Sequence, residues 1–368
     1  MQPHLTSCAS APHRAVLGIV PVALGRPAPE GLLRDIASSS PEDLVAVATA
    51  SHVHPLIWCA FSNSPDLRDA VPPDLPVYFR EIQAANARRN HAIEAHLHTL
   101  GRIADEGRLT PVALKGAVEL LAPRYPSPGA RLLSDIDVLL ANADLARLRQ
   151  SLLDLGAREE AVSEINQRGH HHLPPLLAPG WPCAVELHRQ LGQGAAEHVL
   201  PAEAVLRNAL PVTAAGVRVP SGADRLAHTV LHAQFGQTDR LALPRISLRD
   251  VIDFGLLSRD LSGEELAAAR DRFAQAGEVE AFDRMSALAA RLLDGDATRQ
   301  AAWVDRVLTA FGEPHSLRRQ SDLGWLQHYA RGFLYEPDRR QHYLKTLASW
   351  RGLRRLAAFH RERRRWFR

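Results

Sequence analysis

Hydrophobic positions recur at helical spacing in two stretches of the chain, and the stretch between them follows a different pattern. From residue 29 to about residue 106 the spacing predicts helices. One begins at Pro41, with acidic residues in its first turn. A longer amphipathic helix is expected over 77–103 and ends at Gly107, with apolar positions at Ile82, Ala85, Ile93, Leu97 and Leu100.

Beyond Pro201 the helical spacing returns. Ser221 is a suitable N-cap for the first of these helices. The helices expected there cover 223–235, 248–257, 263–275 and 279–293, followed by an Arg-rich helix over 344–368.

Between these stretches, short apolar runs alternate with helical segments. Strands are expected at 111–114, 136–140 and 183–187, and helices at 116–121 and 144–155. Residues 171–177 can pair with 183–187 across a turn, although Pro174 and Pro175 restrict them to an edge strand. This alternation predicts a small mixed α/β unit.

These patterns predict an α+β protein in five parts. The first 28 residues lack helical periodicity and are expected to be extended. The remaining parts are a helical N-terminal region (29–107), a core (108–220), a helical C-terminal domain (221–350) and an Arg-rich C-terminal helix or tail (351–368).

Composition narrows the class of protein. The chain of 368 residues is 46% hydrophobic and 23% charged, which is ordinary for a soluble globular protein. No apolar run approaches the roughly 18–20 residues that span a bilayer. Residues 15–24 have the length of a signal-peptide core, but Gly18 and Pro21 interrupt them. Three scattered cysteines predict neither a disulfide framework nor a zinc site, so we expect a reducing, cytoplasmic location.

The basic charge is concentrated at the C-terminus. Residues 351–368 hold eight Arg and one Glu, a net +7, so an overall charge of +3 leaves −4 on the rest of the chain. Three interpretations stay open. The segment can be an amphipathic helix docked on the body, a nucleic-acid contact, or a site for an acidic peptide or membrane surface. We favour the first.

Two acids carry the main chemical signal. Asp135 and Asp137 flank Ile136, and on a strand they project to the same side. Neighbouring carboxylates repel each other unless a cation bridges them, and Mg²⁺ prefers such oxygen ligands together with substrate phosphates. The alternative is a solvated pair at the start of a strand or a helix-capping pair.

Two flanking segments favour the cation site. Lys115 and Gly116 follow a strand and open a helix, where an ammonium and a close backbone approach suit a phosphate. Glu186 and His188 share one face of the strand over 183–187, so Glu186 offers a third carboxylate. An ordinary strand–helix turn and a solvated edge strand are the respective alternatives. His188 has an accessory role as metal ligand or as a partner that orients Glu186, or it is structural.

Taken together, these motifs resemble the uncharacterised nucleotidyltransferase family of the DNA polymerase β superfamily. The resemblance covers roughly residues 40–260. It is carried by Leu114-Lys115-Gly116, Tyr125-Pro126, Gly129, Arg131, Ser134-Asp135-Ile136-Asp137-Val138-Leu139 and Glu186-Leu187-His188, with Arg88-Arg89-Asn90 and Leu248-Arg249-Asp250-Val251 further out.

The resemblance implies a polymerase-β-like core in which Asp135, Asp137 and Glu186 hold the catalytic Mg²⁺ or Mn²⁺ ions. It places the triphosphate of an NTP, such as ATP, over Gly116. We expect nucleotide contacts from Lys115, Gly116, Arg131 and Ser134. Two departures stand out. Gly116-Ala117 replaces the Gly-Ser of the wider superfamily, and the third acid is Glu where Asp is more frequent.

Other polar residues have competing interpretations. Arg131 can bind a nucleotide phosphate, shield the acids, or form a surface ion pair. The tract 170–172 is a metal-binding composition, but strand alternation predicts that His171 points away from its two neighbours. Asp250 and Asp253 lie three apart on a predicted helix and can face the cleft, but we favour a solvated helix surface.

We therefore expect a metal-dependent enzyme that moves an NMP from an NTP to an unidentified hydroxyl or phosphate acceptor. Relatives of the family include proteins resembling peptide-tailoring enzymes, so a peptide acceptor is an option. One rival is a catalytically weak nucleotide- or partner-binding protein on the same fold. The other is a nucleic-acid-binding module that uses the Arg-rich tail; nucleic acid is not the favoured partner.

Overall fold

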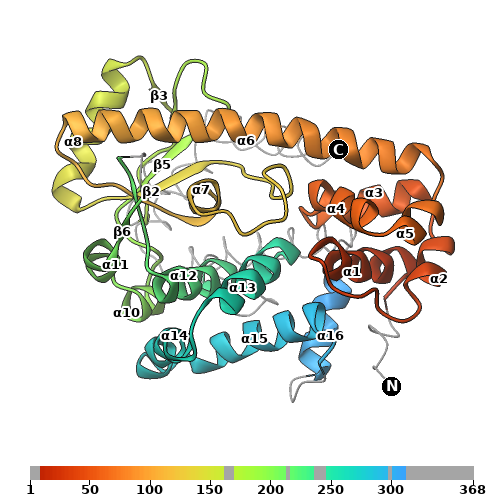
Figure 1. Ribbon diagram of the computed structural model, residues 1–368. Helices are drawn as coiled ribbons and strands as arrows, with labels where there is room; N and C mark the ends of the chain where they lie inside the picture. The colour runs from red at the N-terminus through yellow and green to blue at the C-terminus, as the bar shows by residue number, and fades with distance from the viewer. Residues whose placement is uncertain (1–8, 161–169, 213–215, 236–245, 297–300, 312–368) are drawn as a thin grey trace, which may run out of the picture. The chain divides into compact units, whose positions relative to one another are not determined.

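The computed structural model describes residues 9–160, 170–212, 216–235, 246–296 and 301–311 (Figure 1). It is a mixed α/β structure in which helices surround a seven-stranded mixed sheet. Within the described ranges, no helix is both long enough and apolar enough to cross a membrane.

The chain begins with a buried helix, which corrects the expectation of an extended N-terminal segment. Helix α1 (Ala11–Ala23) is apolar on all sides, and its residues 15–23 are buried. It contacts α2 (Leu32–Ala37), α3 (Pro41–Ala50) and α4 (His54–Asn63). A helix buried on every side needs no polar face, so its sequence lacks the periodicity that marks a surface helix.

The long helix α6 (Asp74–Glu106) follows the short α5 (Pro65–Asp69) and ends at Gly107, as predicted. Its buried face differs from the predicted one in the first half. Ala85 is exposed, whereas Asn86 and Asn90 are buried together with Ile93. The two amides take core positions because the turn before β2 offers them backbone carbonyls.

The sheet has the strand order β3-β4-β5-β2-β1-β7-β6. Its strands are β1 (Val112–Ala113), β2 (Ile136–Leu139), β3 (Arg158–Glu159), β4 (Leu176–Leu177), β5 (Val185–His188), β6 (Leu210–Pro211) and β7 (Arg218–Val219). Central strand β2 is parallel to β5 and antiparallel to β1. The predicted pairing of this segment with β5 is confirmed, since Leu176 pairs with Val185 and His172 bridges to His188. It is not the edge strand that was expected, because β4 also pairs with β3.

Short helices connect the strands. They are α7 (Lys115–Leu121), α8 (Asn142–Asp154), α10 (Ala195–Val199) and α11 (Ala202–Asn208). One hydrophobic cluster joins the inner face of the sheet to α8 and to the second half of α6, through residues such as Leu97, Val138 and Leu148. This packing holds β2 and β5, the strands that carry Asp137 and Glu186, in place.

The C-terminal helices share their core with the N-terminal ones. They are α12 (Gly222–Phe235), α13 (Leu248–Asp260), α14 (Gly263–Gln275), α15 (Val279–Leu293) and α16 (Ala301–Ala310). A single cluster of buried residues includes Leu17 of α1, Leu56 of α4 and Leu288 of α15, and α1 contacts α15 directly. Figure 1 shows α12 and α13 on one side of the sheet strands and α6 on the other.

Candidate functional site

The register of two parallel strands brings the central acids together. Asp137 of β2 lies beside Glu186 of β5, and Leu139 lies beside His188. Ring or carboxylate atoms of Asp137, Glu186 and His188 lie within 4.8 Å of one another, so these three residues can hold a cation. The prediction placed Asp135 in such a set and gave His188 an accessory role, as metal ligand or as a partner of Glu186. Among the described residues, the compact set contains His188 and does not contain Asp135.

Asp137 is the most buried carboxylate of this group, with 1% of its surface exposed. Lys115 Nζ donates to its Oδ1 over 2.8 Å, and His188 Nε2 contacts the same oxygen at 2.7 Å. Burial alone would raise the pKa of Asp137, but the charges of Lys115 and His188 outweigh it and hold that pKa well below its usual range. Within the described structure its buried Oδ2 has no hydrogen-bond partner.

Asp135 has the opposite electrostatic environment. It lies just before β2, half-buried, and accepts a hydrogen bond from Ser134 Oγ at 3.0 Å. Burial and the charge of Asp137 raise its pKa to about 6, although Lys115 opposes the shift. Burial is the largest cause of this shift, and the charge of Lys115 does not offset it.

Lys115 reaches the acids because of an unusual backbone conformation. Its φ of 47° lies in the left-handed region, which costs about 1 kcal/mol for a residue with a Cβ. Its pKa is raised because the attraction of Asp137, followed by those of Asp135 and Glu186, outweighs burial. We predicted that the Lys115 ammonium would bind a phosphate; in the structure it contacts the carboxylate of Asp137.

Gly116 is required by a close neighbour. A Cβ at this position would lie 2.3 Å from Arg131 Nη1, so the guanidinium packs directly over the glycine. Arg131 is itself buried and bound to Asp253, with Nη2 to Oδ2 at 2.7 Å and Nε to Oδ1 at 3.0 Å. Arg131 therefore forms a buried ion pair with Asp253, and it neither forms a surface ion pair nor shields the metal-site acids. The expected solvation of Asp253, and of the buried Asp250, is wrong.

Asp253 is held by further contacts. Tyr125 Oη donates to its Oδ1 over 2.7 Å. Burial would raise the pKa of Asp253, but the charge of Arg131 outweighs it and lowers that pKa. Asp250 caps α13, because its side chain accepts from the backbone N–H of Ser247 at 3.1 Å. Asp253 faces inward because it binds Tyr125 and Arg131, which are distant in sequence. Asp250 faces inward because it belongs to the cap of α13.

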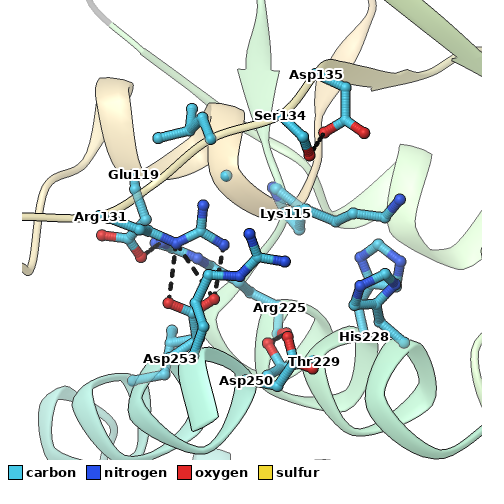
Figure 2. A pocket seen from close by; sticks show the side chains of 16 residues that line it. Lys115, Glu119, Arg131, Ser134, Asp135, Arg225, His228, Thr229, Asp250 and Asp253 are labelled. Atoms are coloured by element: carbon cyan, nitrogen blue, oxygen red, sulfur yellow. Dashed lines mark hydrogen bonds and ion pairs between the residues drawn. The ribbon is translucent and has the colours of Figure 1, made fainter. Parts of the chain in front are cut away.

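A pocket lies between α7 and the residues before β2 on one side and α12 and α13 on the other. Figure 2 shows Asp135 and Lys115 on one side of it and the Arg131–Asp253 pair on the other. Its lining includes Ser134, which is exposed, and also Arg225, His228 and Arg249. Arg225 and His228 were not predicted, and Arg249 stood in the resemblance without a role, since nothing in a helical pattern distinguishes a pocket-facing Arg or His from a solvated one.

Arg225 and Arg249 differ in their contacts. Arg225 is buried and forms an ion pair with Glu119, which also accepts from the backbone N–H of Arg124 at 3.1 Å. Arg249 donates to the carbonyl of Leu132 at 3.3 Å, and its buried Nε has no hydrogen-bond partner among the described residues. Arg249 therefore keeps a buried donor that no described residue satisfies.

Helix α6 positions the segment that leads into β2. Asn86 Nδ2 donates to the carbonyls of Gly129 and Arg131, both at 2.9 Å. Asn90 Nδ2 donates to Pro128 at 2.7 Å and to Arg131 at 3.0 Å. A Cβ at Gly129 would lie 2.3 Å from the Gln83 carbonyl, so glycine permits this approach.

The clamp continues at Arg89, which donates to the carbonyl of Leu133. Together with Asn86 and Asn90 it fixes the backbone on both sides of Arg131. The resemblance had included the polar stretch around Asn90, but no role followed from its sequence pattern.

The histidine tract also departs from its predicted geometry. One ring nitrogen from each of His170, His171 and His172 lies within 4.8 Å of the other two. The expected separation of His171 is wrong, since the backbone here is not a regular strand. Burial lowers the pKa of His170 to about 4 and that of His171 to about 2, with neighbouring imidazoles adding to both shifts.

Ala117 explains why one departure from the superfamily pattern is tolerated. Its methyl group is fully buried in the hydrophobic cluster beneath the sheet and is not part of the pocket lining. A serine hydroxyl at this position would enter the core. The predicted Arg-rich segment 351–368 lies outside the described residues.

Comparison with known proteins places the chain. No curated protein matches it. A family model described as "uncharacterised nucleotidyltransferase" matches residues 37–294, a range that contains both strands of the acidic centre and helices α12 and α13. The protein belongs to this uncharacterised nucleotidyltransferase family.

Proposed function

We propose that this protein is a metal-dependent nucleotidyltransferase with a polymerase-β-like core, which moves an NMP from an NTP to a hydroxyl or phosphate acceptor and releases pyrophosphate. The observation that carries the proposal is that the two carboxylate oxygens of Asp137 differ in their partners. Its Oδ1 is held by Lys115 and His188, while its buried Oδ2 has no hydrogen-bond partner among the described residues.

The donor set fits a divalent cation. A buried carboxylate oxygen without a partner is costly unless an ion satisfies it. Asp135 nearby has a pKa raised by burial and by the charge of Asp137, so a cation beside it would favour its ionised form. Asp135, Asp137 and Glu186 would hold Mg²⁺ or Mn²⁺ through oxygen ligands, with His188 positioning Asp137. When bound, the cation would supply the positive charge that a triphosphate and a departing pyrophosphate require.

The chain's own cations complete the nucleotide site. We place Lys115, Ser134 and Arg249 at the triphosphate, because all three line the pocket next to Asp135. Arg249 has an unused buried donor, and an arginine suits a phosphate through paired N–H groups. Arg131 shapes this wall by packing over Gly116, while its charge is matched by Asp253.

Glu186 is the residue suited to receive the proton of an acceptor hydroxyl. It is half-buried, and its Oε2 lies 3.5 Å from His188 Nε2 and from His172 Nε2. A carboxylate next to the metal-holding Asp137 can take up this proton as the new phosphate ester bond forms. The acceptor can be a small molecule, a peptide or a protein; peptide tailoring is a role suggested by the family resemblance.

The test is pyrophosphate release with each of the four NTPs, in Mg²⁺ or Mn²⁺, with acceptor pools of small metabolites and of peptides. Wild type should release pyrophosphate, and the Asp135→Asn/Asp137→Asn variant should be at least about 100-fold slower. The matched control is Asp105→Asn/Asp154→Asn, which changes two carboxylates outside the pocket. Metal-dependent NTP binding without release in any pool would favour a nucleotide-binding protein and count against the transferase.

A further inference from the structure

The histidine tract 170–172 lies beside the acidic centre and has no part in the proposed transfer. Its three rings are packed with centroids 4.2–4.9 Å apart. Consecutive residues of a regular strand would point to alternate faces, so this convergence depends on the local backbone. Strand β5 holds that backbone, since the N–H of Arg189 donates to the His171 carbonyl at 2.9 Å and His172 bridges to His188.

The ring nitrogens are oriented as in a metal site. His172 Nδ1 lies 2.6 Å from the carbonyl of Leu173, which can only accept, so this nitrogen carries the hydrogen. In the neutral ring Nε2 then holds the lone pair, and it faces Glu186 Oε2 at 3.5 Å. A backbone carbonyl that fixes the tautomer of an imidazole is the usual support of a histidine ligand. In addition, His170 Nδ1 is buried and has no hydrogen-bond partner within the described structure.

We propose that His170, His171 and His172 form a second metal site, for a transition-metal ion of the Zn²⁺ class, adjacent to the carboxylate site. Neutral imidazoles suit Zn²⁺, Co²⁺, Ni²⁺ and Cu²⁺, whereas Mg²⁺ prefers oxygen ligands. The nitrogens lie within 4.8 Å of one another, so rotation of the rings must draw them together around an ion with Zn–N bonds of about 2.0–2.1 Å. All three rings are partly exposed, which leaves the ion a route from solvent.

Three histidines leave a coordination position open, as in catalytic zinc sites. Glu186 is the charged neighbour on that side, through its 3.5 Å contact with His172. The second site would therefore place a positive charge beside Glu186. This inference does not depend on nucleotidyl transfer, because it rests on the imidazole geometry alone.

The experiment is a Co²⁺ titration of the full-length, tag-free protein, followed by visible absorption and by displacement with Zn²⁺. With excess Mg²⁺ present to occupy the carboxylate site, wild type should bind one equivalent of Co²⁺ with the absorption of a nitrogen-ligated ion, and His171→Ala/His172→Ala should weaken this binding at least tenfold. Two controls should bind as wild type does. His91→Ala/His198→Ala removes two exposed imidazoles, and Asp135→Asn/Asp137→Asn removes the neighbouring acids.

Absence of the absorption band in wild type would overturn the proposal, as would unchanged binding by the histidine variant. Loss of binding in the aspartate variant would also overturn it, because the ion would then belong to the carboxylate site. The thermal midpoint guards against a misfolded variant. Zn²⁺ should raise the Tm of wild type and of both controls, and it should not raise that of His172→Gln, whose metal-free Tm should match wild type.

Discussion

Two groups of buried charges, one around Asp253 and one around Asp137, differ in how many of their carboxylate oxygens have hydrogen-bond partners. On the side of α13, Asp253 receives hydrogen bonds from Tyr125 and Arg131 on one oxygen and from Arg131 on the other. At the end of β2, Asp137 has two partners on Oδ1 and none of the described residues on Oδ2. Asp135 beside it has a raised pKa.

The difference separates structure from function. A buried acid with every oxygen satisfied is stable as it stands, and removing its partner is what costs free energy. An acid with an unsatisfied buried oxygen carries a free-energy cost that a bound ligand would relieve. The Arg131–Asp253 pair therefore joins the core to α13, whereas the centre around Asp137 is suited to bind a cation.

The largest expected effect comes from breaking the matched pair. Asp253→Ala would leave the Arg131 guanidinium buried without its partner, and we expect the free energy of unfolding to fall by about 3–5 kcal/mol. Urea unfolding measures this. The control is Asp260→Ala, which removes an exposed partner of Arg124 and should cost less than about 1 kcal/mol. Equal losses in the two variants would contradict the structural role of the pair.

Replacing Asp135 by Asn and replacing Asp137 by Asn should change the stability of the metal-free protein in opposite directions. The pKa of Asp135 is about 6 in the folded state against 3.8 for the free residue, so its contribution is fully favourable below pH 3.8 and is lost as the pH rises through 6. Asp135→Asn should therefore stabilise the metal-free protein at pH 8 by about 1–3 kcal/mol. The gain should disappear near pH 4.

Asp137→Asn is the matched comparison. Its pKa is held well below 3.8, so ionised Asp137 stabilises the protein above that pH and loses its contribution in acid. The variant should be destabilised at pH 8 in EDTA. Urea unfolding at both pH values tests the pair, and a loss of stability in Asp135→Asn at pH 8 would show that its charge is already matched.

A smaller effect is expected at the clamp on the segment before β2. Asn90→Ala removes donors to the carbonyls of Pro128 and Arg131 and should cost about 1–3 kcal/mol. It should also slow pyrophosphate release, because that segment carries the metal-site acids. Asn63→Ala removes a comparable amide contact, to Val22, and should leave the rate unchanged. If both variants kept the wild-type rate, α6 would have no positioning role.

The smallest effect is expected at Ala117, where the superfamily that the sequence resembles has Ser. Ala117→Ser should change stability by about 1 kcal/mol and should not increase activity, because the side chain faces the core. Steady-state rates of pyrophosphate release provide the measurement. A tenfold gain would place residue 117 at the triphosphate and contradict this account of the pocket wall.

Local patterns were enough to predict the strands around Asp137 and Glu186, the long helix ending at Gly107 and the four helices α12 to α15, whereas α16 was not predicted. The strand register then brought the two acids together, as side-chain alternation suggested. What the sequence could not give depends on tertiary partners. Helix α1 is buried on all sides and so has no periodicity, and Asp253 is buried only because Arg131, distant in sequence, binds it.

The central claim is that the acids at the end of β2 bind a divalent cation, and Mn²⁺ binding followed by electron paramagnetic resonance tests it most directly. Titrations with and without ATP would use wild type, Asp137→Asn and His171→Ala/His172→Ala. We expect wild type to bind Mn²⁺, and to bind it more tightly with ATP. This binding should be lost in Asp137→Asn and retained in the histidine variant. Equal Mn²⁺ binding by wild type and Asp137→Asn would contradict it.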